Sequence, residues 1–198
     1  MMRRNILVSG GIGCGKSFVL GVFNALGIPS YDADSRAKGL YDTDSALLAA
    51  VVDAAGEDVL SGGRLDRKAL ASKIFASPEL RARIEALVHP AVMRDFARWR
   101  DGQDCPLAIM ESAILLEHPD LLADMDWKVV VTAPMDVRVK RIALRDNATP
   151  EQIAARIASQ CDDSRRVGMA DFVIENDGIK AILPQIIVFL KQIKFLER

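Results

Sequence analysis

The sequence predicts an α/β fold in which a parallel sheet is covered by helices on both faces. Two observations lead to this fold class. A glycine-rich segment directly follows the first apolar run, as in sheets that carry a phosphate-binding loop. Short, almost continuously apolar runs also alternate with helical patterns, which is typical of a parallel sheet buried between helices. The predicted strands are residues 5–9, 28–31, 107–110, 128–132 and 172–174.

The glycine-rich segment, Gly10–Ser17, is a full match to the pattern G-x-x-x-x-G-K-[ST]. Its glycines let backbone N–H groups approach phosphate oxygens, Lys16 can reach the β- and γ-phosphates, and the Ser17 hydroxyl can hold Mg²⁺. Apolar positions in residues 18–26 keep helical spacing, so the loop opens a helix whose positive dipole end favours phosphate. A glycine-rich turn without nucleotide is the alternative, and the motif's context disfavours it. The sequence therefore predicts a P-loop NTPase core.

Composition limits the other function classes. The 198 residues are enough for one compact unit, and no apolar run approaches the roughly 18 residues of a membrane span. The net charge of −1 gives no global attraction to nucleic acid. The first residues lack a signal-peptide pattern, and Cys14, Cys105 and Cys161 match neither a disulfide framework nor a metal site. We therefore expect a cytoplasmic protein, a monomer or weak homo-oligomer, that binds neither nucleic acid nor membrane.

Two helical insertions interrupt the predicted core. Residues 35–100 are too long for a simple crossover between two strands, and we interpret them as a substrate-side surface; a purely structural helical layer is the alternative. Residues 134–169 form the second insertion, interpreted as a lid. The core of this single domain then comprises residues 1–34, 101–133 and 170–198.

Local signals place several helix ends. Ser77 and Pro78 have the form of a helix cap and first helical residue, and Pro90 should kink or split the helix that they begin. Residues 149–152 have the form of a capping box. The apolar spacing of residues 179–195 predicts a last helix docked on the core.

Three arginines share one face of the helix predicted after Pro134, namely Arg138, Arg141 and Arg145. Like charges on one face repel each other unless an anion meets them. Two interpretations remain open. The arginines form a solvated basic face, or they form a lid that closes over the transferring phosphates.

Asp32 follows the second predicted strand, so its carboxylate should face the phosphate loop at the carboxyl edge of the sheet. There it can accept or orient the proton of an acceptor hydroxyl during phosphoryl transfer. A helix cap or an outer Mg²⁺ ligand is the alternative. Glu111, at the end of the third strand, is either a more distant Mg²⁺ partner or a simple strand-end carboxylate. His89 and His118 have no partner at metal-ligand spacing.

Cys14 lies in the loop at a helix N-terminus, where a thiol pKa is ordinarily lowered. We therefore expect a reactive thiol, if it is exposed. A bulky alkylating reagent should then inactivate the protein, and nucleotide should protect it.

Several segments together resemble the dephospho-coenzyme A kinase family, and the resemblance runs over nearly the whole chain. The phosphate loop alone is generic. Residues 32–34, the segment ending at His89 and Pro90, and the lid pattern of Arg156–Gln160 are more specific to the family. The matching segments are residues 9–17, 32–34, 65–75 running on to 87–90, 114–117, 141–146, 156–160 and 170–176.

The resemblance implies ATP-dependent phosphorylation of the ribose 3′-hydroxyl of dephospho-coenzyme A, with Mg²⁺ as cofactor. It implies that Asp32 is the base and that Lys16 and Arg141 act on the transferring phosphoryl group. Ser9, Asp32 and His89 fall on the substrate side, and residues 35–100 on the coenzyme side. The implied nucleotide-binding residues are Gly11, Gly13, Cys14, Gly15, Lys16, Ser17, Phe18, Arg145, which contacts phosphate from the lid, and Asn176 beside the adenine.

Four positions depart from the family pattern: Ser9, Cys14, Phe18 and Ala113 stand where other residues are usual. None of these changes removes a loop N–H, the lysine or the hydroxyl that would hold Mg²⁺, so the implied activity is not in doubt. Ala113 replaces a usual proline and makes the loop of residues 112–117 harder to place.

Two other functions use a loop of this kind. A nucleoside-monophosphate kinase or other small-metabolite kinase has the same core and lid and is the alternative enzyme. A nucleotide switch is disfavoured, because the sequence has no guanine-reading N-K-x-D motif. Its D-x-x-G match at Asp53–Gly56 falls in a helical stretch rather than after a strand.

Overall fold

The structure is a computed structural model that describes residues 3–196 and divides the chain into two compact units. The first unit contains the residues up to Tyr31 and those from Gln103 onward, and the second is Asp32–Gly102. The outermost residues of the predicted core, 1–2 and 197–198, lie outside the described residues.

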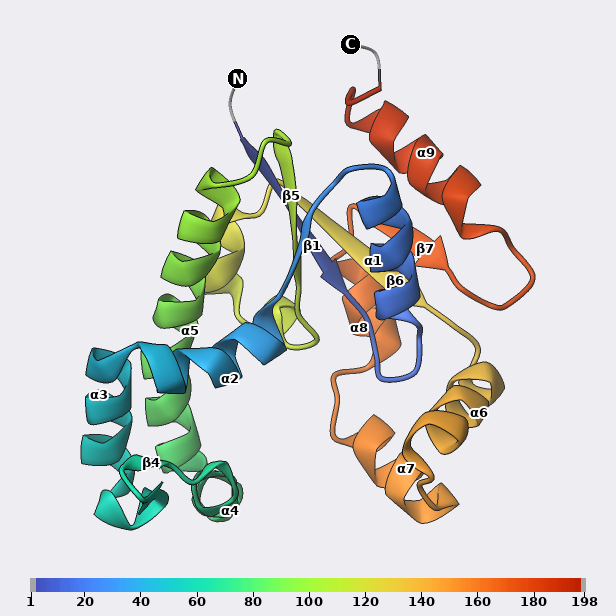
Figure 1. Cartoon of the computed structure of the whole chain (residues 1–198). Helices are drawn as coiled ribbons and strands as arrows, with labels where there is room; N and C mark the ends of the chain where they lie inside the picture. The colour runs from blue at the N-terminus through green and yellow to red at the C-terminus, as the bar shows by residue number, and fades with distance from the viewer. Residues whose placement is uncertain (1–2, 197–198) are drawn as a thin grey trace. The chain divides into compact units, whose positions relative to one another are not determined.

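The first unit is built on a five-stranded sheet in the order β2-β5-β1-β6-β7 (Figure 1). The central strand β1 pairs in parallel with β5 and β6, and β6 pairs in parallel with β7. The predicted strands and α/β architecture are confirmed. The strand bounds are β1 Arg4–Ser9, β2 Ser30–Asp32, β5 Leu107–Glu111, β6 Trp127–Thr132 and β7 Phe172–Glu175.

The central strand is apolar throughout because both faces of the sheet are covered. Ile6, Leu7 and Val8 have no exposed surface, which explains a continuous apolar run instead of an alternating one. In the register, Val8 lies opposite Glu111 on β5 and Val129 on β6. The carboxyl end of β1 therefore delivers the phosphate loop beside the end of β5.

Helices follow the strands of this unit. Helix α1 (Lys16–Ala25) begins at the phosphate loop and packs against α9 (Ile182–Gln192), which also contacts β7. The segment predicted as a lid contains α6 (Met135–Asp146), α7 (Pro150–Ala158) and α8 (Asp163–Gly168). Two short 3₁₀ helices, η2 (Leu115–Glu117) and η3 (Pro119–Asp124), follow β5. Over residues 3–196, no helix has the length and apolar character needed to cross a membrane.

The last helix is docked on the core, as the sequence predicts. Phe189 on α9 is fully buried and makes ring contacts with Phe23, Trp127 and Phe172, which come from α1, β6 and β7. Aromatic pairs of this kind add to the free energy of burial itself. Phe189 therefore joins α9 to helix α1 and to two strands of the sheet.

The second unit consists of helices that pack on α5 (Pro78–Asp101). Helices α2 (Ala33–Thr43), α3 (Ser45–Ala55) and α4 (Arg67–Ala76) all contact it. A feature absent from the prediction is a small antiparallel hairpin, β3 (Leu60–Ser61) with β4 (Arg64–Leu65), preceded by the 3₁₀ helix η1 (Glu57–Val59).

Helix α5 begins as the sequence predicts, because the Ser77 hydroxyl accepts a hydrogen bond from Leu80 N. The prediction that Pro90 could split the helix is wrong, since α5 continues through that residue. Proline removes one N–H donor and leaves the carbonyl of Ala86 without its usual helical partner. Both Pro90 and Ala86 are exposed, so water can replace the missing bond and the helix continues.

The substitution Phe189→Ala tests how far the sheet layer depends on α9. Removing this ring from a packed core should lower the free energy of unfolding by about 3–5 kcal/mol, as measured by urea denaturation. The adjacent Val188→Ala is the control, because Val188 is 57% exposed and its loss should change stability by only about 0.5 kcal/mol. Equal losses for the two variants would contradict the position of Phe189 at the centre of the packing.

Candidate functional site: the phosphate loop and its contacts

The phosphate loop runs from the end of β1 into α1, and its shape depends on glycines at defined positions. Gly15 caps α1 with φ of 87°, in the left-handed region that favours glycine. A Cβ atom there would lie 2.2 Å from Asn176 Nδ2, and one on Gly11 would lie 2.4 Å from Arg138 Nη2. Side chains from distant segments therefore occupy the space that the absent Cβ atoms leave.

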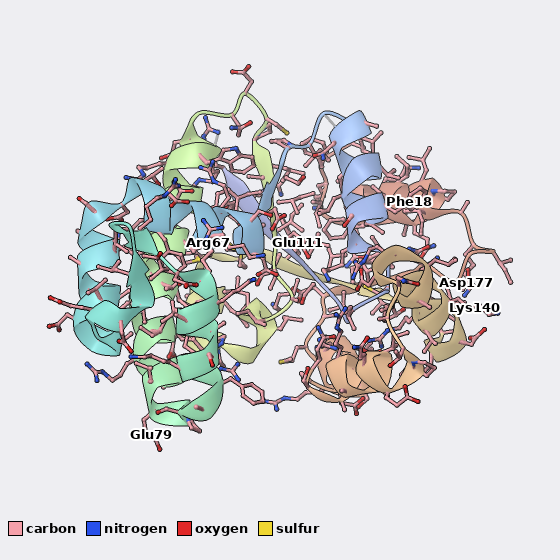
Figure 2. All side chains as sticks on the ribbon, turned by 60° about the horizontal axis from the view of Figure 1, so that its bottom comes forward. Phe18, Arg67, Glu79, Glu111, Lys140 and Asp177 are labelled. Atoms are coloured by element: carbon pink, nitrogen blue, oxygen red, sulfur yellow. The ribbon has the colours of Figure 1, made fainter. Side chains whose placement is uncertain are left out.

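The ammonium group of Lys16 makes two contacts within the site. Its Nζ donates to the carbonyl oxygen of Gly10 at 3.0 Å and lies 3.4 Å from Glu111 Oε1. Lys16 and Glu111 are each 14% exposed, so solvent screens this ion pair only partly. Glu111, labelled in Figure 2, thus orients the lysine from the end of β5.

The carbonyl oxygen of Cys14, in the middle of the loop, receives two donors from distant segments. Asn176 Nδ2 donates to it at 2.9 Å and Arg141 Nη1 at 3.3 Å. Arg141 also donates to the carbonyl oxygen and to Oδ1 of Asn176, at 3.0 and 3.1 Å. The segment after β7 and helix α6 are therefore tied to the loop and to each other.

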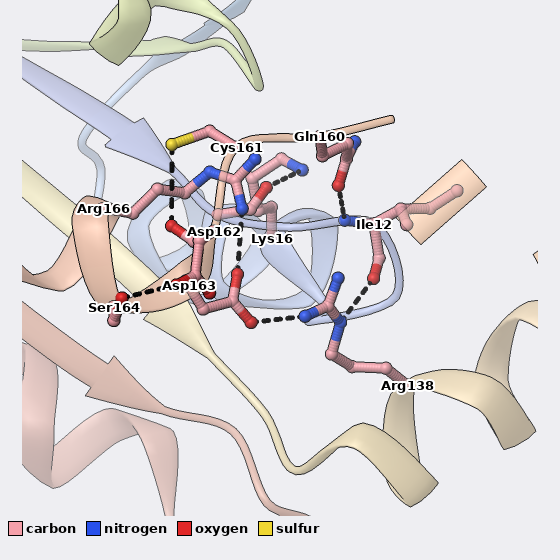
Figure 3. A network of polar contacts seen from close by, with 10 residues as sticks. Ile12, Lys16, Arg138, Gln160, Cys161, Asp162, Asp163, Ser164 and Arg166 are labelled. Atoms are coloured by element: carbon pink, nitrogen blue, oxygen red, sulfur yellow. Dashed lines mark hydrogen bonds and ion pairs between the residues drawn. The ribbon is translucent and has the colours of Figure 1, made fainter. Parts of the chain in front are cut away.

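Ile12, near the tip of the loop, is bound through both polar groups of its backbone (Figure 3). Its N–H donates to Gln160 Oε1 at 2.8 Å, and its carbonyl oxygen accepts from Arg138 Nε at 2.8 Å. Arg138 also pairs with Asp163, whose second oxygen accepts from Arg166 Nη1 at 2.9 Å. Figure 3 shows these contacts as one continuous network around the loop.

The three arginines that share one helical face have three different environments. Arg138 is buried in the network at Ile12, and Arg141 contacts Cys14 and Asn176. Only Arg145 is exposed, and its hydrogen bonds to Asp146 raise its pKa and lower that of Asp146. A solvated basic face therefore does not describe Arg138 or Arg141, which both bind the loop.

Cys14 is not exposed, so the condition for a reactive thiol is not met, and the expected lowering of its pKa is wrong. Cys14 is 1% exposed, and desolvation by this burial raises the pKa of the thiol above its usual value. The positive charge of Lys16 lowers the pKa and offsets part of the effect. The sequence position indicates a helix N-terminus correctly, but not that the sulfur packs inward.

A surface pocket of about 590 Å³ opens beside the loop. Gly15, Phe18, Arg141 and Asn176 line it, together with residues 178–182 before and within α9. Phe18, labelled in Figure 2, is 61% exposed, and Ile179 is 91% exposed. Apolar side chains thus line a pocket that is continuous with a phosphate-binding loop.

Asp32, Ser9 and His89, the three residues predicted on the substrate side, lie on different elements of the chain. Asp32 begins the second unit and caps α2, with Oδ1 accepting from Ser35 N at 2.9 Å and Oδ2 from Ser35 Oγ at 2.6 Å. Asp32 therefore caps a helix, which is the alternative role given for it, and the position of its carboxylate facing the loop stays a prediction. Ser9 is fully buried at the end of β1, and His89 is half-buried on α5. Their roles toward substrate also stay predictions.

The donor groups near the loop suit Mg²⁺ bound mainly through phosphate. Within residues 3–196, no group of three or more His, Cys, Asp or Glu side chains is arranged to hold a metal ion. Mg²⁺ in phosphoryl-transfer sites needs few protein ligands, because phosphate oxygens and water complete its shell. The exposed Ser17, next to Lys16 at the start of α1, fits such a site.

Sequence reasoning missed part of the network at Ile12. Gln160 is part of the pattern Arg156–Gln160, but nothing in the spacing indicates that it meets a loop 148 positions earlier. Asp163 and Arg166, on α8, carried no recognised signal. Their burial and pairing depend on tertiary packing.

Comparison with known proteins gives concordant results. The family model described as dephospho-CoA kinase matches residues 5–181. A dephospho-CoA kinase of Bacteroides fragilis is 40% identical over 195 residues, which are 96% of this chain and 95% of that protein.

Solved structures extend the comparison to the fold. TT1252 from Thermus thermophilus superposes with a TM-score of 0.85 at 29% identity, over 97% of this chain and 98% of that one. A shikimate kinase from Bacteroides thetaiotaomicron reaches 0.58 at 13% identity, over 96% of this chain and 98% of that one. This second likeness shows the fold alone, which kinases with different acceptors share.

Cysteine labelling tests the burial of Cys14. In the native protein, iodoacetamide should modify Cys14 at least about 10-fold more slowly than Cys105 and Cys161, because a buried thiol is poorly accessible and weakly ionised. Cys105 and Cys161 are only partly buried and serve as internal references. Peptide mass spectrometry gives the three rates, and labelling in urea should equalise them. If Cys14 reacted fastest in the native protein, its assigned environment would be wrong.

Proposed function

This chain belongs to the dephospho-CoA kinase family and is an ATP-dependent phosphotransferase with an alcohol acceptor. We propose that it transfers the γ-phosphoryl group of ATP to the ribose 3′-hydroxyl of dephospho-CoA, which yields CoA and ADP in the last step of CoA synthesis. The observation that carries this proposal is the convergence of Lys16 and Arg141 on one phosphate loop. Phosphoryl transfer depends mainly on such fixed positive charge and on positioning.

On the donor side, we place the triphosphate along the loop and the adenine in the pocket beside it. Phe18 and Ile179 offer apolar surface to the base, and Arg141 lies between the loop and the pocket. Asn176 lines the same pocket, and its side-chain amide is bonded to the Cys14 carbonyl oxygen and to Arg141. Arg145, exposed on the same helix as Arg141, is the second lid contact that we assign to phosphate.

The Ser17 hydroxyl would hold the Mg²⁺ that accompanies ATP. When bound, the ion neutralises phosphate charge that develops during transfer. Lys16 supplies a further charge from the protein, and its contact with Glu111 keeps the ammonium group near the loop.

On the acceptor side, we assign Asp32 as the group that accepts or orients the 3′-hydroxyl proton. Each carboxylate oxygen has two lone-pair positions, so the two bonds to Ser35 leave room for an acceptor hydroxyl. The helical second unit would then bind the coenzyme portion. Ser9 and His89 are also assigned to the substrate side on the strength of the family pattern.

We further propose that the protein works in the cytoplasm as a monomer or weak homo-oligomer. The three free cysteines support a reducing compartment.

Acceptor competition tests the proposed function. With MgATP, the purified protein should phosphorylate dephospho-CoA faster than AMP, adenosine or shikimate, and the product should carry the new phosphate on the ribose 3′-oxygen. Mass spectrometry and phosphorus NMR identify that product. If a rival acceptor were phosphorylated faster, the chain would be a different small-metabolite kinase.

The variant Asp32→Asn distinguishes a role of the Asp32 carboxylate as a base from its role as a helix cap. Asparagine caps helices as well as aspartate does, so the fold should be retained. Loss of the carboxylate should lower kcat by about 10²-fold or more, because the group that receives the proton is gone. Isotope-labelled product formation and calorimetric binding of dephospho-CoA measure the two effects separately.

Asp44→Asn is the matched control for that variant. Asp44 caps α3 in the same unit, with Oδ1 accepting from Leu47 N at 2.9 Å, and has no assigned chemical role. Its kcat should stay within about twofold of the wild-type value. Normal turnover in Asp32→Asn would leave Asp32 as a cap alone.

The lid assignment predicts unequal effects along α6. Arg141→Ala should lower kcat by about 10²-fold, because it removes both a phosphate-facing charge and a bond to the loop. Arg145→Ala should lower kcat less, since Arg145 is exposed and paired with Asp146. Neither change should weaken binding of dephospho-CoA as much as it lowers kcat.

Lys140→Ala provides the control for helix α6. Lys140 is 76% exposed, and its Nζ lies 3.7 Å from Asp136 Oδ2 on the same helix. Its removal therefore tests the loss of a positive charge at the surface of α6. Steady-state kinetics of the three variants decide the assignment. Small, equal effects at Arg141, Arg145 and Lys140 would contradict a lid role for the arginines.

A further inference from the structure

The peptide groups on both sides of Ile12 are fixed by different parts of the lid segment. Arg138 lies on α6 and binds the carbonyl oxygen, whereas Gln160 lies after α7 and binds the N–H (Figure 3). A backbone N–H can only donate, so the partner atom on Gln160 is necessarily its oxygen. Rotation of either peptide group would break its own 2.8 Å hydrogen bond.

These contacts also decide which loop N–H groups can meet phosphate. The N–H of Ile12 is bound to Gln160, and that of Cys14 donates to the Gly11 carbonyl oxygen at 3.2 Å. The N–H groups of Ile12 and Cys14 are therefore engaged within the protein, and we expect phosphate to bind at the N-terminal end of α1, where N–H groups and the helix dipole favour an anion. The two bonds at Ile12 fix the backbone that leads to this end of the helix.

We call the two hydrogen bonds from Gln160 and Arg138 to the backbone of Ile12 the clamp. Asp163 holds Arg138 in place. It pairs with Arg138, whose side chain is 3% exposed, and with Arg166, whose side chain is 1% exposed. The carboxylate of Asp163 thus orients two buried guanidinium groups. If Arg138 moved away from Ile12, it would also lose its ion pair with Asp163 and leave a buried charge without compensation. The contact at Ile12 is built into the packing of α6 and α8.

We infer that Gln160, acting with Arg138, is a positioning residue of the nucleotide site: it holds the Ile12 peptide and so sets the phosphate loop in the form that binds nucleotide. The residue reaches no reacting atom and acts through the loop backbone. This inference rests on the proposed function of the loop as the ATP site. It assigns the lid segment a task apart from contact with phosphate, which is to maintain the shape of the loop.

The variant Gln160→Leu tests the inference, because leucine keeps most of the side-chain volume and removes the acceptor. The Kd for MgADP, measured by calorimetry, and the KM for ATP should both rise by about 10-fold, equivalent to 1.4 kcal/mol of binding free energy. The KM for dephospho-CoA should stay unchanged. Hydrogen exchange at the N–H of Ile12 should accelerate, since its acceptor is gone. Gln160→Ala should act in the same direction.

Gln152→Leu is the matched control. Gln152 belongs to the same segment, and its Oε1 accepts from Thr149 N in the capping box of α7. It should leave the Kd for MgADP within about twofold of wild type. Equal nucleotide affinity in wild type and Gln160→Leu, or equal losses in Gln160→Leu and Gln152→Leu, would overturn the clamp alone. Failure of the wild-type protein to bind MgADP would instead overturn the proposed function and, with it, the clamp.

Discussion

The hydrogen bonds to the Cys14 carbonyl oxygen are the interaction on which the site depends. A loop of small residues has no core of its own, so groups from elsewhere must fix its backbone. Asn176, after β7, and Arg141, on α6, supply the donors, and the missing Cβ of Gly15 leaves room for them. The parallel sheet makes this possible because β1 and β7 both end at the edge where the loop begins.

The basic side chains around the loop differ in the groups that orient them. Lys16 is oriented by Glu111, Arg138 by Asp163, and Arg145 by Asp146, whereas Arg141 contacts backbone and amide oxygens. Arg141 is therefore the arginine of this helix that contacts uncharged groups near the loop. That distinction gives a physical reason to expect its contribution to transfer to exceed that of Arg145.

Local signals predicted much of the molecule, and tertiary contacts account for most of what they missed. The loop, the strands and the cap at Ser77 follow from spacing and capping chemistry that act over a few residues. The β3–β4 hairpin could have been found from its Gly62–Gly63 turn, where both φ angles are positive. Burial of Cys14 and the clamp of Gln160 on Ile12 depend on segments that meet only in the folded chain.

The most direct test of the account is single-turnover transfer from MgATP to dephospho-CoA in Lys16→Ala. In the proposed function, Lys16 brings a point charge to the β- and γ-phosphates. Its removal should therefore slow transfer by at least about 10²-fold while the circular dichroism and melting temperature stay near wild type. Lys140→Ala, the exposed control, should react at the wild-type rate. Near-normal transfer in folded Lys16→Ala would contradict the claim that the loop of residues 10–17 performs the chemistry.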